Sequence, residues 1–330
     1  MKKKTKRFIT WTVAVIIIAL LLPVFIHNDY YLMVMNRVLI NIVVVLGLNF
    51  ITGLTGQMNL GTAGIFALGA YASALFTKYT NLSPWLGLIV AIFMGLLIGR
   101  GLGYPSLRVK GVYLSLTTIG FAEVVRLLIS NLTGLTGGTQ GVRDIKPYSI
   151  FGYQFTTQKS MYYLFLAFVV LAFFIAWRIA YSKWGRIFKS LRDNVEAVEM
   201  SGVDIASCKI KAFTIAAIFG TVGGAMYAHF MGYINPSTFN LDLSTNYVIM
   251  LMVGGLGSVV GNVFGAGIVT ILPEVLRFLG DYYQIVFCTI ILLGAIFFPN
   301  GWVDAVLNLV KKVRRAFMRV TAEDGGDGRG

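Results

Sequence analysis

Several long, uninterrupted runs of apolar residues constrain the fold of this chain more than any other feature. Residues 13–22, for example, read VAVIIIALLL. A helix needs roughly 20 apolar residues to cross the hydrocarbon core of a bilayer, whereas strands of a transmembrane β-barrel alternate apolar and polar residues. Only 13% of the residues are charged, against about 25% in an average soluble domain. The sequence therefore predicts an all-α, polytopic helical membrane protein.

The apolar runs define candidate membrane spans of unequal length. They are residues 8–26, 36–54, 57–77, 84–102, 111–131, 160–180, 210–231, 244–257, 259–279 and 282–299. The pair 244–257 and 259–279 is interrupted by glycines and fits either two crossings or a re-entrant hairpin, so we predict about 8–10 transmembrane segments. The run 8–26 exceeds the apolar core of about 7–15 residues in a signal peptide, and no A-x-A site follows. We interpret it as an uncleaved first helix.

Lysine and arginine gather in four places, which are the N-terminus, the loops after the fourth and sixth spans, and the C-terminal tail. Basic residues are in excess on the cytoplasmic side of membrane proteins, and an even number of crossings puts all four places there. We therefore predict that both termini are cytoplasmic. The net charge of +14 lies at the ends of apolar runs, which fits orientation and contact with the lipid bilayer and does not indicate a nucleic-acid partner.

This pattern predicts a single transmembrane domain over residues 1–310. The domain includes an extracellular loop at 132–159 and a cytoplasmic loop at 182–209. A basic and then flexible cytoplasmic tail follows at 311–330.

Polar residues and glycines interrupt the apolar stretch GLNFITGLTGQMNLGTAGIFALGAYASALFT at 47–77. Polar groups at membrane depth are costly unless they find partners in the protein or line a water-filled cavity. Glycine-interrupted spans are pointers to a transport path. The two features together favour a translocation pathway over helix packing alone. The residues predicted to line it are Thr55, Gln57, Asn59, Thr62, Glu123, Arg126 and Asn262.

Two features permit both a structural and a functional interpretation. Glu123 and Arg126 lie three residues apart on one helix face, so they are either functional charges inside the membrane or an ion pair that only fixes a neighbouring helix. Gly257, Gly261 and Gly265 are spaced four apart, and for these glycines alone close helix packing is the better interpretation.

The cytoplasmic stretch 182–211 carries an amphipathic pattern. Its apolar residues recur at helical spacing from Ile187 to Val198, and Gly202 would end the helix. One interpretation is a helix that lies on the membrane surface. The other is a docking helix whose apolar stripe fills a groove in a cytoplasmic partner. Acidic residues on the polar face modestly favour a protein partner.

The sequence gives no sign of catalysis. The phosphate-binding motif G-x-x-x-x-G-K-[ST] is absent, also from the glycine-rich loop 132–145, and neither H-E-x-x-H nor G-x-S-x-G occurs. Two cysteines and two histidines are too few and too scattered for a metal site. We expect a non-catalytic chain that binds no metal and no cofactor of its own.

Several blocks together resemble one family. In chain order they are GLNFITGLTGQMNLGTAGIFALGAYASALF, VKGVYLSLTTIGFAEVVRLL with TGGTQGV, WGRIFKSLRDNVEAVEMSGVD, and VGGLGSVVGNVFGAGIVTILPEVLR with FFPNGW. In this order, over residues 38–303, they resemble the LivM-like membrane permease subunits of branched-chain amino acid ABC importers.

The resemblance implies an ATP-driven importer in a bacterial or archaeal cytoplasmic (inner) membrane. The implied partners are a second permease subunit, two cytoplasmic ATPase subunits that bind the ATP, and an extracellular substrate-binding protein. The resemblance also places the ATPase coupling loop in the longest cytoplasmic segment. The residues that match this loop are Gly185, Arg186, Leu191, Glu196, Ala197 and Gly202.

Substrate identity is less constrained than family. The resemblance implies leucine, isoleucine and valine, while urea, short amides or nucleosides are alternatives within the same architecture. The chain departs from the family at Thr62, where His is frequent, and at Asn262, where Pro is frequent. An ion-driven secondary transporter is less favoured, since Glu123 is the one obvious group for an ion relay. A channel is disfavoured because no filter motif is evident.

Overall fold

The described part of the chain folds into a bundle of helices, which confirms the polytopic helical class. The computed structural model describes residues 19–24, 26, 28–109, 111–150, 152–298 and 301–302. Most of the predicted first span 8–26 and the whole predicted tail 311–330 lie outside these residues. The elements are α2 (Asp29–Leu48), α3 (Thr62–Thr80), α4 (Pro84–Gly103), α5 (Val112–Asn131), α6 (Thr133–Thr136), β1 (Ser149–Ile150), β2 (Tyr153–Gln154), α7 (Gln158–Ala180), α8 (Lys183–Asp193), α9 (Val195–Met200), α10 (Ile205–Met231), α11 (Leu241–Gly254), α12 (Val259–Val275) and α13 (Tyr283–Phe297).

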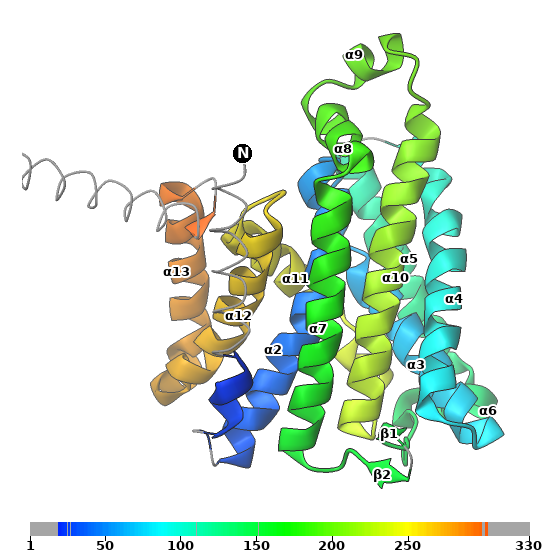
Figure 1. The fold of residues 1–330 in the computed structure, drawn as a ribbon, viewed down its shortest axis with the longest axis vertical. Coiled ribbons are helices and arrows are strands. Elements are labelled where there is room, and N and C mark those ends of the chain that lie inside the picture. The colour runs from blue at the N-terminus through cyan, green and yellow to red at the C-terminus, as the bar shows by residue number, and fades with distance from the viewer. Residues whose placement is uncertain are drawn as a thin grey trace, which may run out of the picture.

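The bundle has two distinct ends. Helices α8 and α9 project from one end, and α6 with the β1–β2 hairpin lies at the other (Figure 1). We call these the α8 end and the α6 end. The predicted cytoplasmic loop 182–209 and the predicted extracellular loop 132–159 are therefore separated by the length of the bundle, as the distribution of basic residues requires.

Six helical stretches among the described residues are long and apolar enough to cross a membrane. They are Asp29–Leu54, Pro84–Leu107, Val112–Asn131, Gln158–Ala180, Ile205–Met231 and Val259–Gly280. A shorter apolar stretch, Tyr283–Gly294, lies in α13. Each of these stretches contains most or all of a predicted span.

The predicted span 57–77 begins later than expected. Helix α2 continues as a π-helical segment over Asn49–Leu54, and α3 starts only at Thr62. Between them Gly56 has a φ of +70°, a left-handed conformation that suits glycine. The side chain of Asn59 accepts a hydrogen bond from the N–H of Gly61 at 2.8 Å. These local interactions end the helical pattern although the sequence stays largely apolar.

Helices α11 and α12 form a tight hairpin that runs between the two ends of the bundle. Shortly before α11, Ile234 bridges Val142 in the loop at the α6 end, and the hairpin turn lies at the α8 end. Helix α11 has 14 residues, fewer than the roughly 20 that a crossing helix needs, and it is not among the stretches that are long and apolar enough to cross. A methyl group at Gly261 or Gly265 would overlap the backbone of α11. Gly257, by contrast, lies in the turn with a φ of +84° and is not part of the helix.

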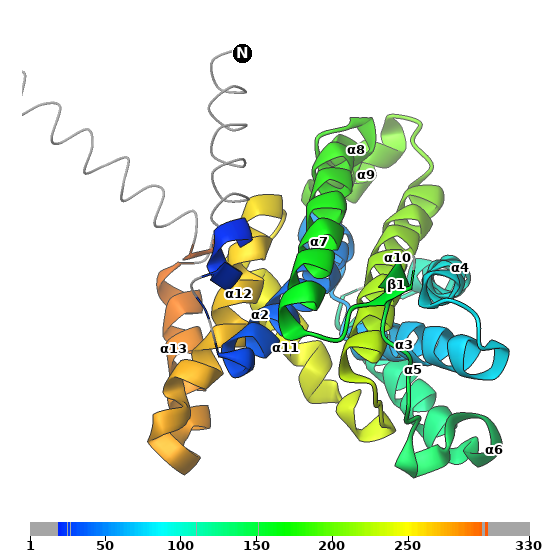
Figure 2. The ribbon, with the colours of Figure 1, turned by 60° about the horizontal axis from the view of Figure 1, so that its bottom comes forward.

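Helix α10 occupies the centre of its half of the bundle, between α7 and α4 and against α3 (Figures 1 and 2). Helices in lipid have no hydrophobic driving force for association, so close packing must stabilise their contacts. Small residues permit this close packing. A methyl group at Gly224 of α10 would overlap the carbonyl oxygen of Phe66, and one at Gly69 of α3 would overlap the backbone of Thr221. The contact between α3 and α10 therefore depends on glycine on both sides.

We expect Gly224→Ala to lower the melting temperature of the purified chain by several degrees. The added methyl group forces α3 and α10 apart, and such overpacking costs about 1–3 kcal/mol. The matched control is Gly101→Ala in α4, since no atom lies within 4 Å of its new methyl group. Thermal unfolding in detergent measures both. A melting temperature for Gly224→Ala at or above that of the control would contradict the packing argument.

Candidate functional site

The chain between α2 and α3, residues 55–61, is not helical and takes hydrogen-bond partners from its surroundings. The N–H of Leu60 donates to the Thr118 hydroxyl of α5 at 3.1 Å, and the N–H of Gly61 donates to Asn59 Oδ1 at 2.8 Å. A methyl group at Gly61 would lie 2.6 Å from the carbonyl oxygen of Thr118. The segment is thus held directly against α5, and its glycine permits the close approach.

The four predicted pathway residues of this region have different surroundings. The Thr55 hydroxyl donates to the carbonyl oxygen of Ile51 at 2.6 Å, and Asn59 is buried in its own turn. Gln57 is half-buried. Gln57 Oε1 and the Thr62 hydroxyl are thus buried polar atoms without a partner among the described residues, whereas Thr55 and Asn59 hold the local backbone.

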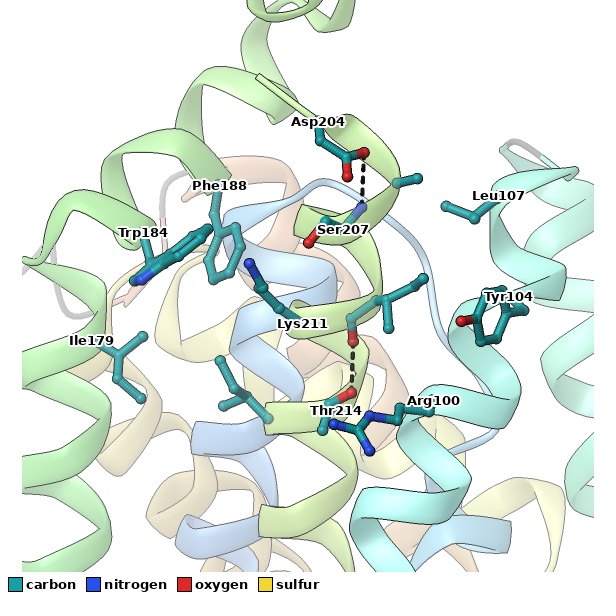
Figure 3. A pocket seen from close by; sticks show the side chains of 13 residues that line it. Arg100, Tyr104, Leu107, Ile179, Trp184, Phe188, Asp204, Ser207, Lys211 and Thr214 are labelled. Atoms are coloured by element: carbon teal, nitrogen blue, oxygen red, sulfur yellow. Dashed lines mark hydrogen bonds between the residues drawn. The ribbon is translucent and has the colours of Figure 1, made fainter. Parts of the chain in front are cut away.

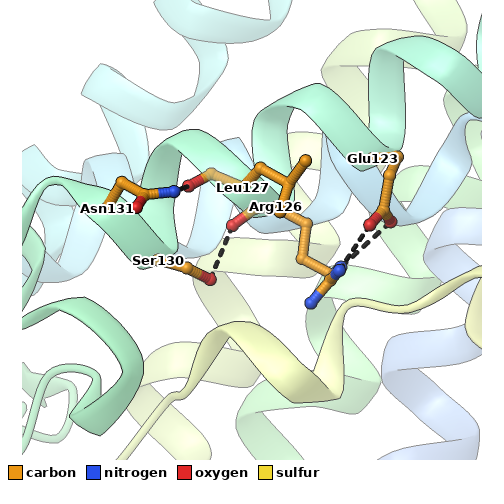
Figure 4. Close-up of polar contacts among 5 residues, drawn as sticks. All are labelled: Glu123, Arg126, Leu127, Ser130 and Asn131. Carbon is orange, nitrogen blue, oxygen red and sulfur yellow. Dashed lines mark hydrogen bonds and ion pairs between the residues drawn. The ribbon is translucent and has the colours of Figure 1, made fainter.

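Glu123 and Arg126 form the predicted ion pair on α5, at the border between its buried and exposed faces (Figure 4). Arg126 Nε donates to Glu123 Oε2 at 3.0 Å, and Nη2 donates to Oε1. The Arg126 and Glu123 side chains are 30% and 47% exposed. Neither bonds a neighbouring helix within the part of the chain that the structure describes. A half-exposed charge pair is costly against lipid, so this face fits a water-lined path or a second subunit.

Asn262 lies in α12, a different helix from the other predicted pathway residues. It is fully buried in α12, and its Cα would lie 2.8 Å from a methyl group at Gly254 of α11. Neither its Nδ2 nor its Oδ1 has a partner among the described residues. The structure therefore does not bring Asn262 together with segment 55–61 through any described hydrogen bond.

Three segments distant in sequence meet at the α8 end in a cluster of Asn49, Gly53, Arg192 and Gly257, which we call the Arg192 junction. Arg192 Nη1 of α8 donates to the carbonyl oxygen of Gly53 at 2.9 Å. The N–H of Gly257, in the α11–α12 turn, donates to Asn49 Oδ1 at 2.9 Å. A methyl group at Gly56 would lie 3.1 Å from Arg192 Cγ. The junction links the predicted coupling loop directly to the start of segment 55–61.

The predicted amphipathic helix of the cytoplasmic loop is two helices. The break lies at Asn194, whose side chain accepts a hydrogen bond from the N–H of Ala197 at 3.0 Å and so caps α9. Gly202, with a φ of +75°, follows the end of α9 as predicted. A methyl group at Gly185 would overlap the carbonyl oxygen of Ala180, so the turn from α7 into α8 requires glycine there.

The apolar stripe of this loop is divided between the interior of the chain and its surface. Leu191 and Val198 are buried within the chain itself, whereas Val195 is 38% exposed. The other exposed side chains include Arg186 on α8 and Glu196 and Met200 on α9, with Met200 90% exposed. A partner would therefore meet the tip of α9, the polar face of α8 and the exposed part of the stripe.

Sequence reasoning missed Asn49 and Arg192. Asn49 is an intramembrane amide, and the rule that selected Asn59 would have selected it as well. Arg192 looked like one of several cations on a polar helix face, and nothing near it in sequence indicates a contact with Gly53. No group of three or more His, Cys, Asp or Glu able to hold a metal ion is present in the described ranges.

Comparison with known proteins gives one family match and several relatives. The family described as "Branched-chain amino acid transport system / permease component" matches residues 30–296. The high-affinity branched-chain amino acid transport system permease protein LivM of Escherichia coli (strain K12) is 31% identical over 286 residues, which cover 80% of this chain and 67% of the relative.

More distant relatives cover a similar or larger share of the chain. The probable branched-chain amino acid transport permease protein LivM of Methanocaldococcus jannaschii is 24% identical over 288 residues, covering 80% of this chain and 83% of the relative. The ribose import permease protein RbsC of Haemophilus influenzae is 22% identical over 306 residues, which cover 89% of this chain and 92% of the relative. No solved structure matches the chain significantly.

We expect Arg192→Met to loosen the Arg192 junction. The change removes the donor to Gly53, so the end of the π-helical segment and the α11–α12 turn should open more often. Hydrogen–deuterium exchange should become about tenfold faster in peptides that cover 53–58 and 255–258, because a hydrogen bond to a charged group contributes about 1.5–3 kcal/mol. Arg186→Met, an exposed arginine on the same helix, is the control, and equal exchange in both variants would contradict the assignment.

Proposed function

The chain belongs to the family of branched-chain amino acid transport system permease components, and from this premise we propose that it translocates leucine, isoleucine and valine. It is a multi-pass protein of the prokaryotic inner membrane and a permease subunit of the ATP-binding cassette importer type. The observation that carries the substrate proposal is the identity of 31% with a branched-chain amino acid permease, against 22% with a ribose permease.

Segment 55–61 and α5 support a route along this side of the chain. Segment 55–61 contacts the buried face of α5 through Thr118, and the same helix carries the half-exposed ion pair of Glu123 and Arg126. Gln57 Oε1 has no described protein partner. Exposed Leu116 and Val124 of α5 supply apolar surface for an aliphatic side chain. A zwitterion with an apolar side chain matches this mixture of groups.

The same face suggests where the second permease subunit packs. Lipid does not stabilise a half-exposed ion pair, and a path between two subunits would leave it in water. We place the partner permease opposite α5, the ATPase subunits at the α8 end, and the extracellular substrate-binding protein at the α6 end. This arrangement follows the predicted orientation, with the basic loops in the cytoplasm.

The Arg192 junction supports a mechanism for coupling. A movement imposed on α9 by an ATPase subunit passes through the short, capped break at Asn194 into α8. Arg192 then transmits it to Gly53, near the end of the π-helical segment that leads into segment 55–61. Because Asn49 also holds the turn at Gly257, the same movement reaches the α11–α12 hairpin. Arg192 acts here as a positioning residue.

A second candidate function is the import of a small neutral solute. Ribose and fructose permeases are among the relatives, at 22% and 26% identity, and urea, short amides and nucleosides fit the same architecture. The deciding experiment measures uptake of labelled leucine by cells with the complete set of transporter genes, with and without this chain. We expect chain-dependent uptake that valine and isoleucine compete and that urea and ribose do not. Chain-dependent uptake of labelled ribose without leucine uptake would establish the alternative.

We expect Gln57→Ala to lower leucine uptake about tenfold at unchanged protein level. The substitution removes a polar group that meets a charged end of the substrate, and losing such a hydrogen bond raises the barrier by at least about 1.4 kcal/mol. Gln154→Ala, exposed in β2 at the α6 end, serves as control. Uptake by Gln57→Ala at the level of this control would remove Gln57 from the pathway.

We expect Glu196→Lys to uncouple ATP hydrolysis from uptake. The residue is exposed on α9, so charge reversal changes the contact with an ATPase subunit without disturbing the bundle. In reconstituted vesicles, leucine transported per ATP hydrolysed should fall by about tenfold, while the amount of inserted chain stays the same. Lys159→Glu, at the start of α7, reverses one charge far from α9. An unchanged ratio for Glu196→Lys would contradict the placement of the ATPase on α9.

A further inference from the structure

A cavity of about 630 Å³ lies at the α8 end, outside the proposed route. The ends of α4 and α7, the first turns of α8 and the start of α10 form its walls (Figure 3). Arg100 and Lys211 approach it from α4 and α10, and Trp184 and Tyr104 stand at its sides. The cavity thus combines two cations with two aromatic side chains at one end of the bundle.

The charges in the cavity are predominantly positive. Neither Arg100 nor Lys211 forms an ion pair with a described residue. Lys211 Nζ lies 3.9 Å from the centre of the Trp184 ring, which positions the ammonium group by a cation–π contact. The one acidic side chain in the lining, Asp204, accepts a hydrogen bond from the N–H of Ser207 at 3.1 Å and caps α10. An anionic group therefore finds two cations there that lack an acidic partner.

The surface next to the cavity, toward the middle of the bundle, is apolar. Three half-buried residues of α10 lie there. Ile215 lines the cavity, and Ile218 lies against Gly95 of α4. Val222 packs with Leu88 of α4 and Phe168 of α7. Helix α7 contributes Ile179 to the lining and exposes Ile175 one turn before it. Chains of hydrocarbon fit this surface, whereas a small soluble anion gains nothing from it.

The position along the bundle gives the leaflet. The α8 end carries the basic loops and is cytoplasmic in the proposed orientation, on which this inference rests. The cytoplasmic leaflet is rich in anionic lipids, and basic pockets between transmembrane helices on this side bind their headgroups. Tryptophan and tyrosine are enriched at the same depth. An anionic lipid matches this combination of cations, aromatic rings and an adjoining apolar surface.

We propose that this cavity binds the phosphate-bearing headgroup of an anionic phospholipid from the cytoplasmic leaflet. Arg100 and Lys211 hold the phosphate, and the acyl chains lie along α10 between α4 and α7. Trp184 and Phe188 belong to α8 and line the cavity. A bound headgroup therefore contacts the helix that also carries Arg192, and the lipid stabilises the position of α8 relative to α10.

Native mass spectrometry of the full-length chain in a mild detergent tests the proposal. Phosphatidylglycerol and phosphatidylcholine are titrated separately onto the wild type, onto the double variant R100Q/K211Q, and onto the control R186Q/K189Q. The control removes two cations from α8 that do not line the cavity. We expect phosphatidylglycerol to bind the double variant about thirtyfold more weakly than wild type, since each membrane-surface cation contributes about a factor of five. The control should change less than about threefold.

Further arms separate the possible sources of the phosphate and guard against misfolding. The variant R100K/K211R keeps both charges and should retain binding within about threefold of wild type. Inorganic phosphate at the lipid's concentration should not displace phosphatidylglycerol. Three outcomes would each overturn the proposal. The double variant and the control could lose phosphatidylglycerol affinity equally, the wild type could bind phosphatidylcholine as tightly as phosphatidylglycerol, or inorganic phosphate could displace the lipid. If R100Q/K211Q does not elute as a folded chain, the single variants replace it, with about a fivefold loss expected for each.

Discussion

In a bilayer every backbone N–H and C=O group needs a hydrogen-bond partner within the protein. At the break between α2 and α3, the peptide groups must find these partners on other helices or in side chains. Segment 55–61, close to the α8 end, is not helical, so its peptide groups do not form a continuous series of helical hydrogen bonds. Thr118 of α5 and Asn59 meet the N–H groups of Leu60 and Gly61. Arg192 of α8 meets the carbonyl oxygen of Gly53. Because these partners belong to different helices, a few peptide groups fix the relative positions of α2, α3, α5 and α8.

The long spans could be predicted from the sequence because hydropathy alone determines them. The predicted ranges 84–102, 111–131 and 160–180 agree closely with α4, α5 and α7. The break between α2 and α3 was predicted between residues 54 and 57 but is longer than predicted, since α3 starts at Thr62. The break at Asn194 was not predicted. Both breaks depend on an asparagine. Asn59 and Asn194 bond to backbone N–H groups two and three residues ahead. Such local bonds compete with the helix, and a continuous apolar or amphipathic pattern conceals them.

The individual residues of the candidate site could be selected from the sequence, but their contacts in space could not. The cost of burying polar groups identifies which side chains need a partner, and it selected Gln57, Glu123 and Asn262. Spacing was enough for the Glu123–Arg126 pair, since both residues share one helix. The contact of Arg192 with Gly53 joins residues 139 positions apart, and no single sequence encodes that proximity. The apolar stripe of α8 and α9 has the same limit, because the pattern does not reveal that the chain itself buries Leu191 and Val198 and leaves Val195 exposed.

The π-helical segment Asn49–Leu54 at the end of α2 contains an extra residue that could lengthen the following chain. A π-helical turn holds one residue more than the α-helical turn it replaces. Relaxation to α-helix would pass that residue onward, advancing the following backbone by about 1.5 Å and turning it by about 100°. Side chains that follow, such as Gln57, would then point in a new direction while the outer bundle stays in place. A shift of one residue in a single helix is therefore sufficient to re-orient the lining of the proposed route.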